Sequence, residues 1–365
     1  MLTRRGHHAL FVGGCVRNAL LGLPVRDVDI ATEARPQRVI ELAQQAGLKP
    51  VPTGLAHGTI TVISDGVAHE VTTFRRDVET DGRRAVIAFA DDVHDDARRR
   101  DFTMNALYAT PEGDVVDPLG SGLEDLAARR LRFVGTPENR IREDYLRILR
   151  FFRFHAWYGD AEAGPDPDAL SACASLVPGL DVLSRERVGA EMRRLLDAPD
   201  PAPAVATMAR IGVLAHVLPG ATPDALACLV HLEGQAGLAP AWLRRLACIG
   251  GQDPVTALRL SREAGRGLVR LQRAMASADP PAALGYWFGT QVACDAVVLR
   301  AAMTGVQPEP DFRAQVARGA QMQFPLRAAD LMPHYRGAAL GRRLTELEAR
   351  WVASGFTLTR AQLLG

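Results

Sequence analysis

The periodicity of apolar residues changes once along this chain, close to Thr136-Pro137. Before that point, stretches in which apolar and polar residues alternate are mixed with stretches of helical periodicity. After it, helical periodicity recurs as far as residue 365, interrupted by Pro, Gly and Asp, with almost no alternation. Strands repeat every two residues and helices every 3.6, so this change predicts two architectures in one chain. We expect an N-terminal α/β domain followed by an all-helical remainder, which makes the fold class α+β.

Local patterns predict the individual elements. In the first third, we expect strands over 9–12, 25–31 and 114–117, helices over 16–21, 36–47 and 97–108, and a hairpin of 58–63 with 69–74 around Ser64-Asp65-Gly66. The polar run 75–96 has little period and predicts a mobile loop. Residues 138–157 predict one long, arginine-rich amphipathic helix, and later helices are expected over 185–196, 201–210, 262–275 and 338–352.

Composition excludes several classes of protein. The chain carries 43 Lys+Arg against 42 Asp+Glu, so its formal charge of +1 argues against a uniformly basic nucleic-acid binder but still allows a local basic face. No apolar run reaches the roughly 18 residues of a membrane span, and the start of the chain has no apolar secretory segment. The 5 cysteines and 9 histidines are scattered, without disulfide or zinc-binding spacing. We therefore expect a cytoplasmic protein with no membrane and no disulfide partner.

The strongest local pattern joins a glycine pair, an arginine and two carboxylates: Gly13-Gly14, Arg17, and Asp27 with Asp29. Carboxylates at i and i+2 of a strand lie on one face, where their oxygens can share one or two Mg²⁺ ions. Such ions can activate an attacking hydroxyl and stabilise the leaving group of a nucleotidyl transfer. A glycine pair before a helix lets backbone N–H groups approach a triphosphate, and Arg17 lies one turn further on. Each half alone is common in ordinary turns, but the combination predicts a nucleotide site.

A second pattern places an arginine beside an acid and an amide. On a helix, Asp101 and Asn105 would share a face, and with Arg100 they would suit a ribose and a phosphate. A solvated helix start explains the same residues equally well.

A third pattern is a stripe of arginines. Arg147, Arg150 and Arg153 recur every three residues of the helix expected over 138–157, and they would repel each other unless they meet an anion, which favours phosphate binding. Asp144 and Arg147 could offer an acceptor and a donor fork to a base edge, whereas the ordinary alternative is a weak i, i+3 pair. Glu70 is either a third metal ligand or, more often in such a place, a structural hydrogen-bond acceptor.

Together these stretches resemble the tRNA nucleotidyltransferase/poly(A) polymerase family, in its bacterial class II branch. The matching segments are 11–22, 27–32, 57–59, 70–75, 99–107, 117–118 and 143–147, and 184–188 with Glu191 resembles the next helix motif. The resemblance is dense over roughly the first 200 residues, beyond which only 337–355 resembles the family's tail.

The resemblance implies a palm-like nucleotidyltransferase head over 1–135, a helical neck with a nucleotide-selecting template over 136–200, and a helical, tRNA-binding body and tail over 201–365. It implies Asp27 and Asp29 as catalytic residues and Mg²⁺ ligands. It implies nucleotide binding by a larger set: Gly13, Gly14, Arg17, Arg100, Asp101, Asn105, Asp144, Arg147, Arg150 and Arg153. The implied reaction adds C, C and A to the tRNA 3′ end from CTP and ATP, by attack of the terminal 3′-hydroxyl on the α-phosphorus with release of pyrophosphate.

Three features depart from the family pattern. Asn18 stands where Asp often follows the motif arginine, the segment before Phe11 is short, and the C-terminal half has no His-Asp phosphohydrolase signature. The alternative activities are poly(A) synthesis, addition of only CC or only A, and, in a different class, RNA binding without catalysis. A dinucleotide dehydrogenase is disfavoured because Gly13-Gly14 does not supply the Gly-x-Gly-x-x-Gly fingerprint.

Overall fold

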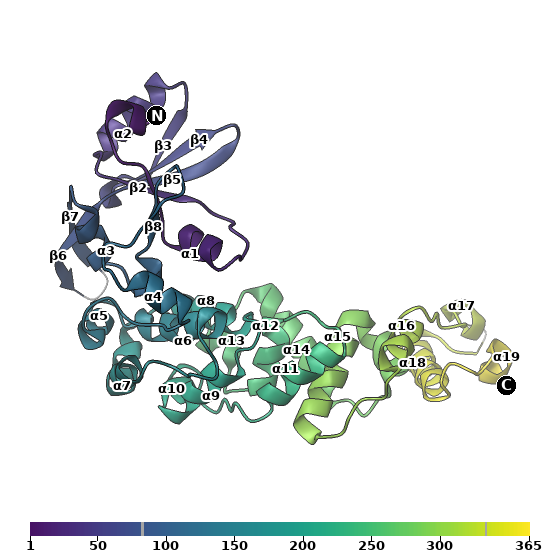
Figure 1. Ribbon diagram of the computed structural model, residues 1–365. Helices are drawn as coiled ribbons and strands as arrows, with labels where there is room; N and C mark the ends of the chain where they lie inside the picture. The colour runs from purple at the N-terminus through teal and green to yellow at the C-terminus, as the bar shows by residue number, and fades with distance from the viewer. Residues whose placement is uncertain (82–83, 333) are drawn as a thin grey trace. The chain divides into compact units, whose positions relative to one another are not determined.

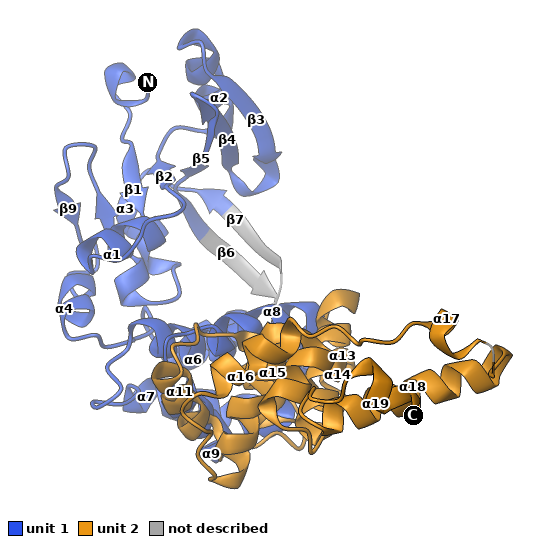
Figure 2. Ribbon diagram, turned by 90° about the vertical axis from the view of Figure 1, so that its right-hand side faces the viewer, with its two compact units in different colours: residues 1–217 blue, residues 218–365 orange. Residues whose placement is uncertain are grey.

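The computed structural model describes residues 1–81, 84–332 and 334–365, and the chain forms two compact units, 1–217 and 218–365 (Figure 2). Every named strand of the described residues lies between positions 10 and 116, and helices make up almost all regular structure after that (Figure 1). The predicted change from a mixed to a helical architecture is therefore confirmed.

A seven-stranded sheet with the order β3-β4-β5-β2-β1-β8-β9 organises the N-terminal part. Its strands are β1 Leu10–Val12, β2 Asp29–Thr32, β3 Lys49–Gly54, β4 Thr59–Ser64, β5 Val67–Thr73, β8 Tyr108–Ala109 and β9 Val115–Val116. β2 pairs with β5 in parallel, and the other neighbours pair antiparallel. β1 leads to the glycine pair and β2 begins with Asp29. These two strands are adjacent in the middle of the sheet.

Two helices accompany this sheet, α1 Gly14–Leu20 and α2 Pro36–Gln45. Buried apolar residues of α2 pack with residues of β4 and β5 to form one core cluster: Val39, Leu42, Ala43, Ile60, Val62 and Val71. The predicted hairpin is confirmed, because β4 and β5 pair up to Ser64 opposite Val67. Asp65 and Gly66 have φ values of 50° and 80°, as a two-residue type I′ turn requires.

The prediction of a mobile loop over 75–96 is wrong for the residues that the structure describes. β6 Arg75–Asp81 and β7 Arg84–Phe89 form an antiparallel ribbon, and α3 Val93–Arg98 follows; positions 82–83 lie outside the described residues. The Asp92 carboxylate caps α3 by accepting from the His94 N–H at 2.9 Å. A two-stranded ribbon has little apolar face to bury, so its sequence lacks the alternation that identifies a core strand.

The helix predicted over 97–108 is also wrong. α3 ends at Arg98, a 3₁₀ turn covers Thr103–Asn105, and the chain between them is extended at Phe102. There the Thr103 N–H donates to the Arg132 carbonyl and the Val134 N–H donates to the Asp101 carbonyl, both at 3.0 Å. Pairing with a distant segment, together with complete burial of Phe102, replaces the local helical hydrogen bonds.

The single long helix predicted over 138–157 is divided into α5 Pro137–Glu143 and α6 Leu146–Tyr158. Asp144, at φ −159° and ψ 104°, is not helical, and its side chain accepts from the Leu146 N–H at 3.1 Å. Asp144, which the sequence placed inside one long helix, is therefore the joint between two helices.

The other helices of the first unit are α4 Gly122–Ala127, α7 Pro167–Ser175, α8 Arg185–Leu196, α9 Ala202–Arg210 and α10 Val213–Val217, and 3₁₀ turns lie at Thr3–Arg5, Leu55–His57 and Val177–Val182. The second unit contains α11 Leu226–Gln235, α12 Trp242–Ile249, α13 Pro254–Ala257, α14 Arg262–Ala276, α15 Pro281–Thr304, α16 Phe312–Ala320, α17 Ala328–Leu331, α18 Gly337–Ala353 and α19 Arg360–Leu364. The helices predicted around 185–196, 201–210, 262–275 and 338–352 agree with these bounds to within one residue at each end.

One helix of the second unit, α15, is long and apolar enough to cross a membrane by length and composition. Its most apolar window is 61% buried inside the unit, as expected of a core helix in a folded domain. Its backbone breaks at Gly289, where φ is 75° and ψ is 167°.

Candidate active site

The glycine pair forms a tight connection between β1 and α1. Gly13 has φ 74°, and a Cβ built there would lie 3.1 Å from Nη1 of Arg100. Both the backbone conformation and this close approach favour glycine. The structure thus brings Gly13 and Arg100, which are far apart in the sequence, to one place at the edge of α1.

The carboxylates lie next to this connection. Asp29 begins β2 and pairs directly with Glu70 of the parallel strand β5. Asp27 lies two residues before β2, because the strand predicted over 25–31 begins only at Asp29. All three are exposed, and within the described part of the chain their side chains make no hydrogen bond or ion pair. Partial burial and then the neighbouring Glu70 raise the pKa of Asp29; Asp27 raises it further and Arg100 opposes the rise.

These carboxylates suit a hard cation, because a cation would relieve the repulsion that raises the pKa of Asp29. Among the described residues, however, no three His, Cys, Asp or Glu side chains are grouped closely enough to hold a metal ion by themselves. A metal at Asp27 and Asp29 would need further oxygen ligands from a nucleotide or water. Glu70, weighed in the sequence mainly as a structural acceptor, makes no such contact and instead faces Asp29 across the strands.

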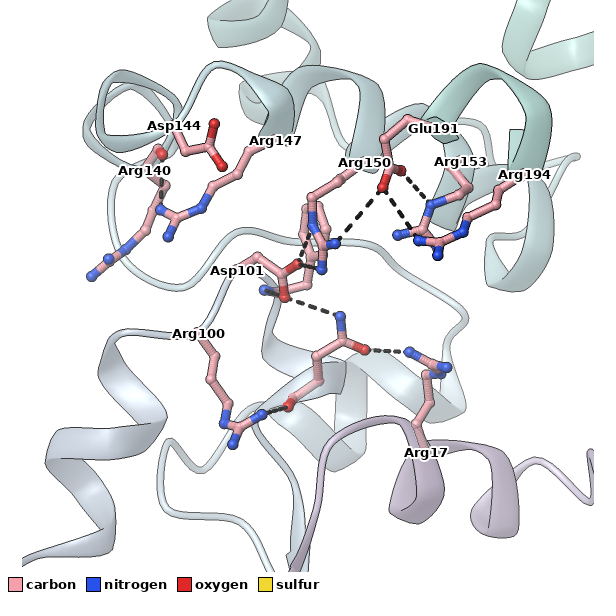
Figure 3. Close-up of polar contacts among 12 residues, drawn as sticks. Arg17, Arg100, Asp101, Arg140, Asp144, Arg147, Arg150, Arg153, Glu191 and Arg194 are labelled. Atoms are coloured by element: carbon pink, nitrogen blue, oxygen red, sulfur yellow. Dashed lines mark hydrogen bonds and ion pairs between the residues drawn. The ribbon is translucent and has the colours of Figure 1, made fainter. Parts of the chain in front are cut away.

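A chain of polar contacts connects α6 with the segment after α3 (Figure 3). Arg150 donates from Nε and Nη2 to Oδ2 of Asp101, at 2.9 and 2.5 Å. Oδ1 of Asp101 accepts from the Phe102 N–H at 2.9 Å and from Nδ2 of Asn105 at 3.0 Å. All four acceptor positions of the Asp101 carboxylate are therefore used.

These contacts lower the pKa of the Asp101 carboxyl group. Burial alone would raise the pKa of Asp101, but the Arg150 guanidinium, the Asn105 amide and the Phe102 N–H outweigh it and lower the pKa to about 2. Asp101 and Asn105 are brought together as predicted, although by a 3₁₀ turn instead of a helix.

Arg17 lies at the far end of the same chain of contacts. Its Nη1 donates to Oδ1 of Asn105 at 2.5 Å, and its Nη2 donates to the Tyr158 hydroxyl at 2.8 Å. Its guanidinium also lies 3.9 Å from the centre of the Tyr158 ring. Asn18 keeps the acceptor role of the aspartate that it replaces, because its Oδ1 accepts from Nη2 of Arg17 at 2.8 Å. Arg17 is buried, and its guanidinium contacts Asn105, Asn18 and Tyr158.

The side chains of Asp144 and Arg147 have different partners, although the Arg147 N–H donates to the Asp144 carbonyl at 2.9 Å. Oδ2 of Asp144 accepts from Nη2 of Arg187, on α8, at 2.6 Å. Arg147 donates to the Glu143 carboxylate and, at 2.8 Å, to the Arg140 carbonyl. The acceptor and the donor fork are thus neighbours (Figure 3), each fixed by a different partner.

The arginine stripe needs no external anion to balance it. Arg147 pairs with Glu143, Arg150 with Asp101, and Arg153 with Glu191 at 2.5 Å. The argument from mutual repulsion to phosphate binding is therefore wrong as a matter of charge balance. Glu143, four residues before Arg147, and two distant acids, Asp101 and Glu191, neutralise the stripe. Arg153 additionally lies 4.1 Å from the Phe154 ring centre.

Two of these supporting residues escaped the sequence reasoning. Tyr158 holds Arg17, and Arg187 holds Asp144. Arg187 lies in the 184–188 motif, but nothing in that motif indicated its partner. Tyr158 lies four residues after Phe154 on α6, so helical spacing could have placed it on the same face. Arg187 lies 43 positions from its partner, a separation that spacing rules do not reach.

Comparisons with known proteins agree with this geometry. Residues 9–132 match the family model described as "Poly A polymerase head domain", and residues 165–224 match "Probable RNA and SrmB- binding site of polymerase A". The mouse protein "CCA tRNA nucleotidyltransferase 1, mitochondrial" is 31% identical over 379 residues, covering 100% of this chain and 87% of the mouse protein. The Geobacillus thermodenitrificans "CCA-adding enzyme" is 41% identical over 221 residues, 60% of this chain and 52% of the relative. For several of these curated relatives, the match spans about half of their length.

Solved structures are similar over nearly the whole chain. The Bacillus stearothermophilus CCA-adding enzyme, solved in complex with CTP, superposes with a TM-score of 0.75 at 31% identity, covering 97% of this chain and 90% of that one. The Thermotoga maritima CCA-adding enzyme complexed with tRNA has a TM-score of 0.69 at 18% identity, covering 99% and 91%, and supports the fold alone.

Proposed function

Because this chain belongs to the tRNA nucleotidyltransferase/poly(A) polymerase family, we propose that it adds C, C and A to the 3′ end of tRNA from CTP and ATP. The observation that carries the proposal is the grouping of Asp27 and Asp29 with Gly13 and Arg100. Asp144 and Arg147, each fixed by its own partner, add to it. Curated relatives with the names of CCA-adding enzymes support the same reaction. The mitochondrial location in the mouse relative's name leaves the cytoplasmic location a prediction.

The proposed chemistry is a direct transfer. The terminal 3′-hydroxyl of the RNA attacks the α-phosphorus, the new O3′–P bond forms as the bond to pyrophosphate breaks, and the hydroxyl proton passes to water. We assign the metal to Asp27 and Asp29 and take it to be Mg²⁺, which when bound supplies Lewis-acid activation of the hydroxyl and of the leaving group. Arg100, next to Gly13, contributes the positive charge closest to the glycine connection.

The remaining predicted residues take positioning and selecting roles. The Asp101 carboxylate has no spare acceptor position. A ribose hydroxyl that bound there would have to replace one of its present hydrogen bonds, for example the one from Asn105. Asp144 and Arg147 would select the base, with the Nε and Nη2 edge of Arg147 as donor. We assign Arg150, Arg153 and Arg17 primarily to positioning the residues that they contact, and only secondarily to nucleotide binding, because protein partners hold all three.

We also propose the predicted division into a head over 1–135, a neck over 136–200, and a tRNA-binding body and tail over 201–365. The first compact unit contains the proposed head and neck and continues to 217.

The experiment is transfer to a tRNA that lacks its last three nucleotides, with Mg²⁺, CTP and ATP, followed by sequencing of the product 3′ ends. We expect CCA ends. Asp29→Asn should abolish transfer, and Asp65→Asn, at an exposed turn of the same sheet, should not change it. Long A tracts from ATP alone would favour poly(A) polymerase, and RNA binding without any transfer would favour the catalytically idle alternative.

A further inference from the structure

A groove of about 920 Å³ lies in the second compact unit, along α14 and the first part of α15. Its apolar lining comes from Val255, Leu260, Val269, Trp287 and Phe288. Trp287 is 39% exposed and Val269 is 52% exposed, so an aromatic and an aliphatic side chain are presented to solvent in one concavity.

Four arginines of α14 line the same groove: Arg262, Arg266, Arg270 and Arg273. They lie on one helix face, because successive members are separated by four, four and three residues. A separation of four residues corresponds to about 6 Å along a helix, on the order of the distance between successive phosphates of a nucleic-acid strand. All four are exposed.

These arginines are not neutralised by the protein. Arg262, Arg266 and Arg273 have no ion pair within the described part of the chain, and Arg270 donates to the Phe288 carbonyl, next to the break in α15, at 2.7 Å. The only acidic residue lining the groove is Asp279, and its carboxylate accepts from the Ser277 hydroxyl at 2.6 Å. The groove differs in this respect from the arginine stripe of α6, where acidic side chains balance every member.

The charge of the whole unit has the same sign. Residues 218–365 contain 16 Arg against 11 Asp+Glu, a net charge of +5, whereas residues 1–217 carry 27 Lys+Arg against 31 Asp+Glu, a net charge of −4. Arg244 and Arg245 are buried against Glu233 and Asp295, so the excess charge lies among the remaining, mostly exposed residues.

We propose that this groove binds the sugar–phosphate backbone of an RNA strand, with Trp287 against a base or ribose. Arginine forks suit phosphate oxygens, and an exposed aromatic side chain among cations is the usual complement of nucleic acid. This inference depends on the proposed function, because we take the RNA to be tRNA. The groove acts as a binding site separate from the transferring residues, and it sets the affinity for RNA without taking part in the reaction.

The test measures tRNA binding by fluorescence anisotropy over a range of salt concentrations. The triple variant Arg262→Gln, Arg266→Gln, Arg273→Gln removes three cations that hold no structural partner. We expect its Kd to rise at least tenfold, and the slope of log K against log salt to fall by about two to three units, since each phosphate contact contributes about 0.7–0.9. The matched control changes Arg4, Arg5 and Arg130, three exposed arginines of the first unit, to Gln and should retain both values.

Two further readouts separate the groove from general effects. In transfer assays the groove variant should raise the KM for tRNA at least tenfold while leaving kcat and the KM for CTP unchanged. tRNA should quench tryptophan fluorescence, and Trp287→Phe should remove most of that quenching.

Several results would overturn the proposal: unchanged Kd and slope in the groove variant, equal losses in the control variant, or tighter binding of polyglutamate than of tRNA, which would assign the groove to an acidic protein segment. If the unmutated chain transfers no CMP, the proposed function fails, while the groove is still judged by tRNA binding alone.

Discussion

The ionised Asp101 carboxylate, held by Arg150, Asn105 and the Phe102 N–H, should stabilise the packing of α6 against the N-terminal part by about 2 kcal/mol. The pKa of Asp101 falls from 3.8 to about 2 in the folded chain, and each pKa unit corresponds to about 1.4 kcal/mol. The Asp101 side chain is 11% exposed, so solvent screens this contact little. Asp101→Asn keeps the shape of the side chain but removes its charge, leaving Arg150 without its bidentate partner.

Hydrogen exchange measures this locally, which matters because the chain has two compact units. We expect Asp101→Asn to reduce the protection of amides in α6, over 146–158, by about 30-fold, the equivalent of 2 kcal/mol. Peptides of 218–365 should not change, and neither should Asp65→Asn protein. A change below about threefold in α6, or an equal loss in both units, would refute the reasoning.

The contacts of Asp101 also make the stability of the α6 packing depend on pH. Because the folded-state pKa is depressed, the stabilisation is complete above the ordinary pKa of about 4 and is lost as pH falls through about 2. The difference in protection between unmutated and Asp101→Asn protein should therefore be constant from neutral pH to about pH 5 and should shrink below pH 4. A difference that persists at pH 2 would show that the substitution acts through shape and not through charge.

Three further predictions concern the supports of the site. Arg187→Gln should lower the preference for CTP over UTP at least tenfold, because it releases Asp144 from its 2.6 Å contact; single-nucleotide incorporation measures this, and an unchanged ratio contradicts it. Gly13→Ala should lower the free energy of unfolding by about 1–2 kcal/mol, because φ 74° disfavours a Cβ and Arg100 lies 3.1 Å from it; a chemical melt with no shift would remove the argument. Tyr158→Phe should cost about 1 kcal/mol of protection in α6 and Tyr158→Leu about twice that, since only the second removes the ring beneath Arg17; equal losses would show that the ring contributes nothing.

The sequence was informative where the chemistry is local. Asp27 and Asp29 are two positions apart, and the glycine pair and its helix are contiguous, so spacing alone was enough to predict them as one site. Register supplied what spacing did not: Glu70 lies directly opposite Asp29 only because β2 and β5 pair in parallel. The segment 97–108 shows the opposite limit, since its helical pattern yields to backbone pairing with residues 132–134.

The arginine stripe shows why a charge pattern on one helix does not by itself indicate a ligand. From the sequence, Arg147, Arg150 and Arg153 form an unbalanced cationic face, yet the folded chain brings acids to that face from positions as far as 49 residues away. The four arginines of α14 also share one helix face, but Asp279, the one acid that lines their groove, forms an ion pair with none of them within the described residues. What distinguishes a binding face from a structural one is therefore the charge left after folding. The near-neutral total of +1 conceals a −4 unit whose stripe is internally paired and a +5 unit whose groove is not. It follows that salt should weaken the binding of RNA far more than the selection of the nucleotide, because the unpaired arginines would displace counterions from the RNA phosphates.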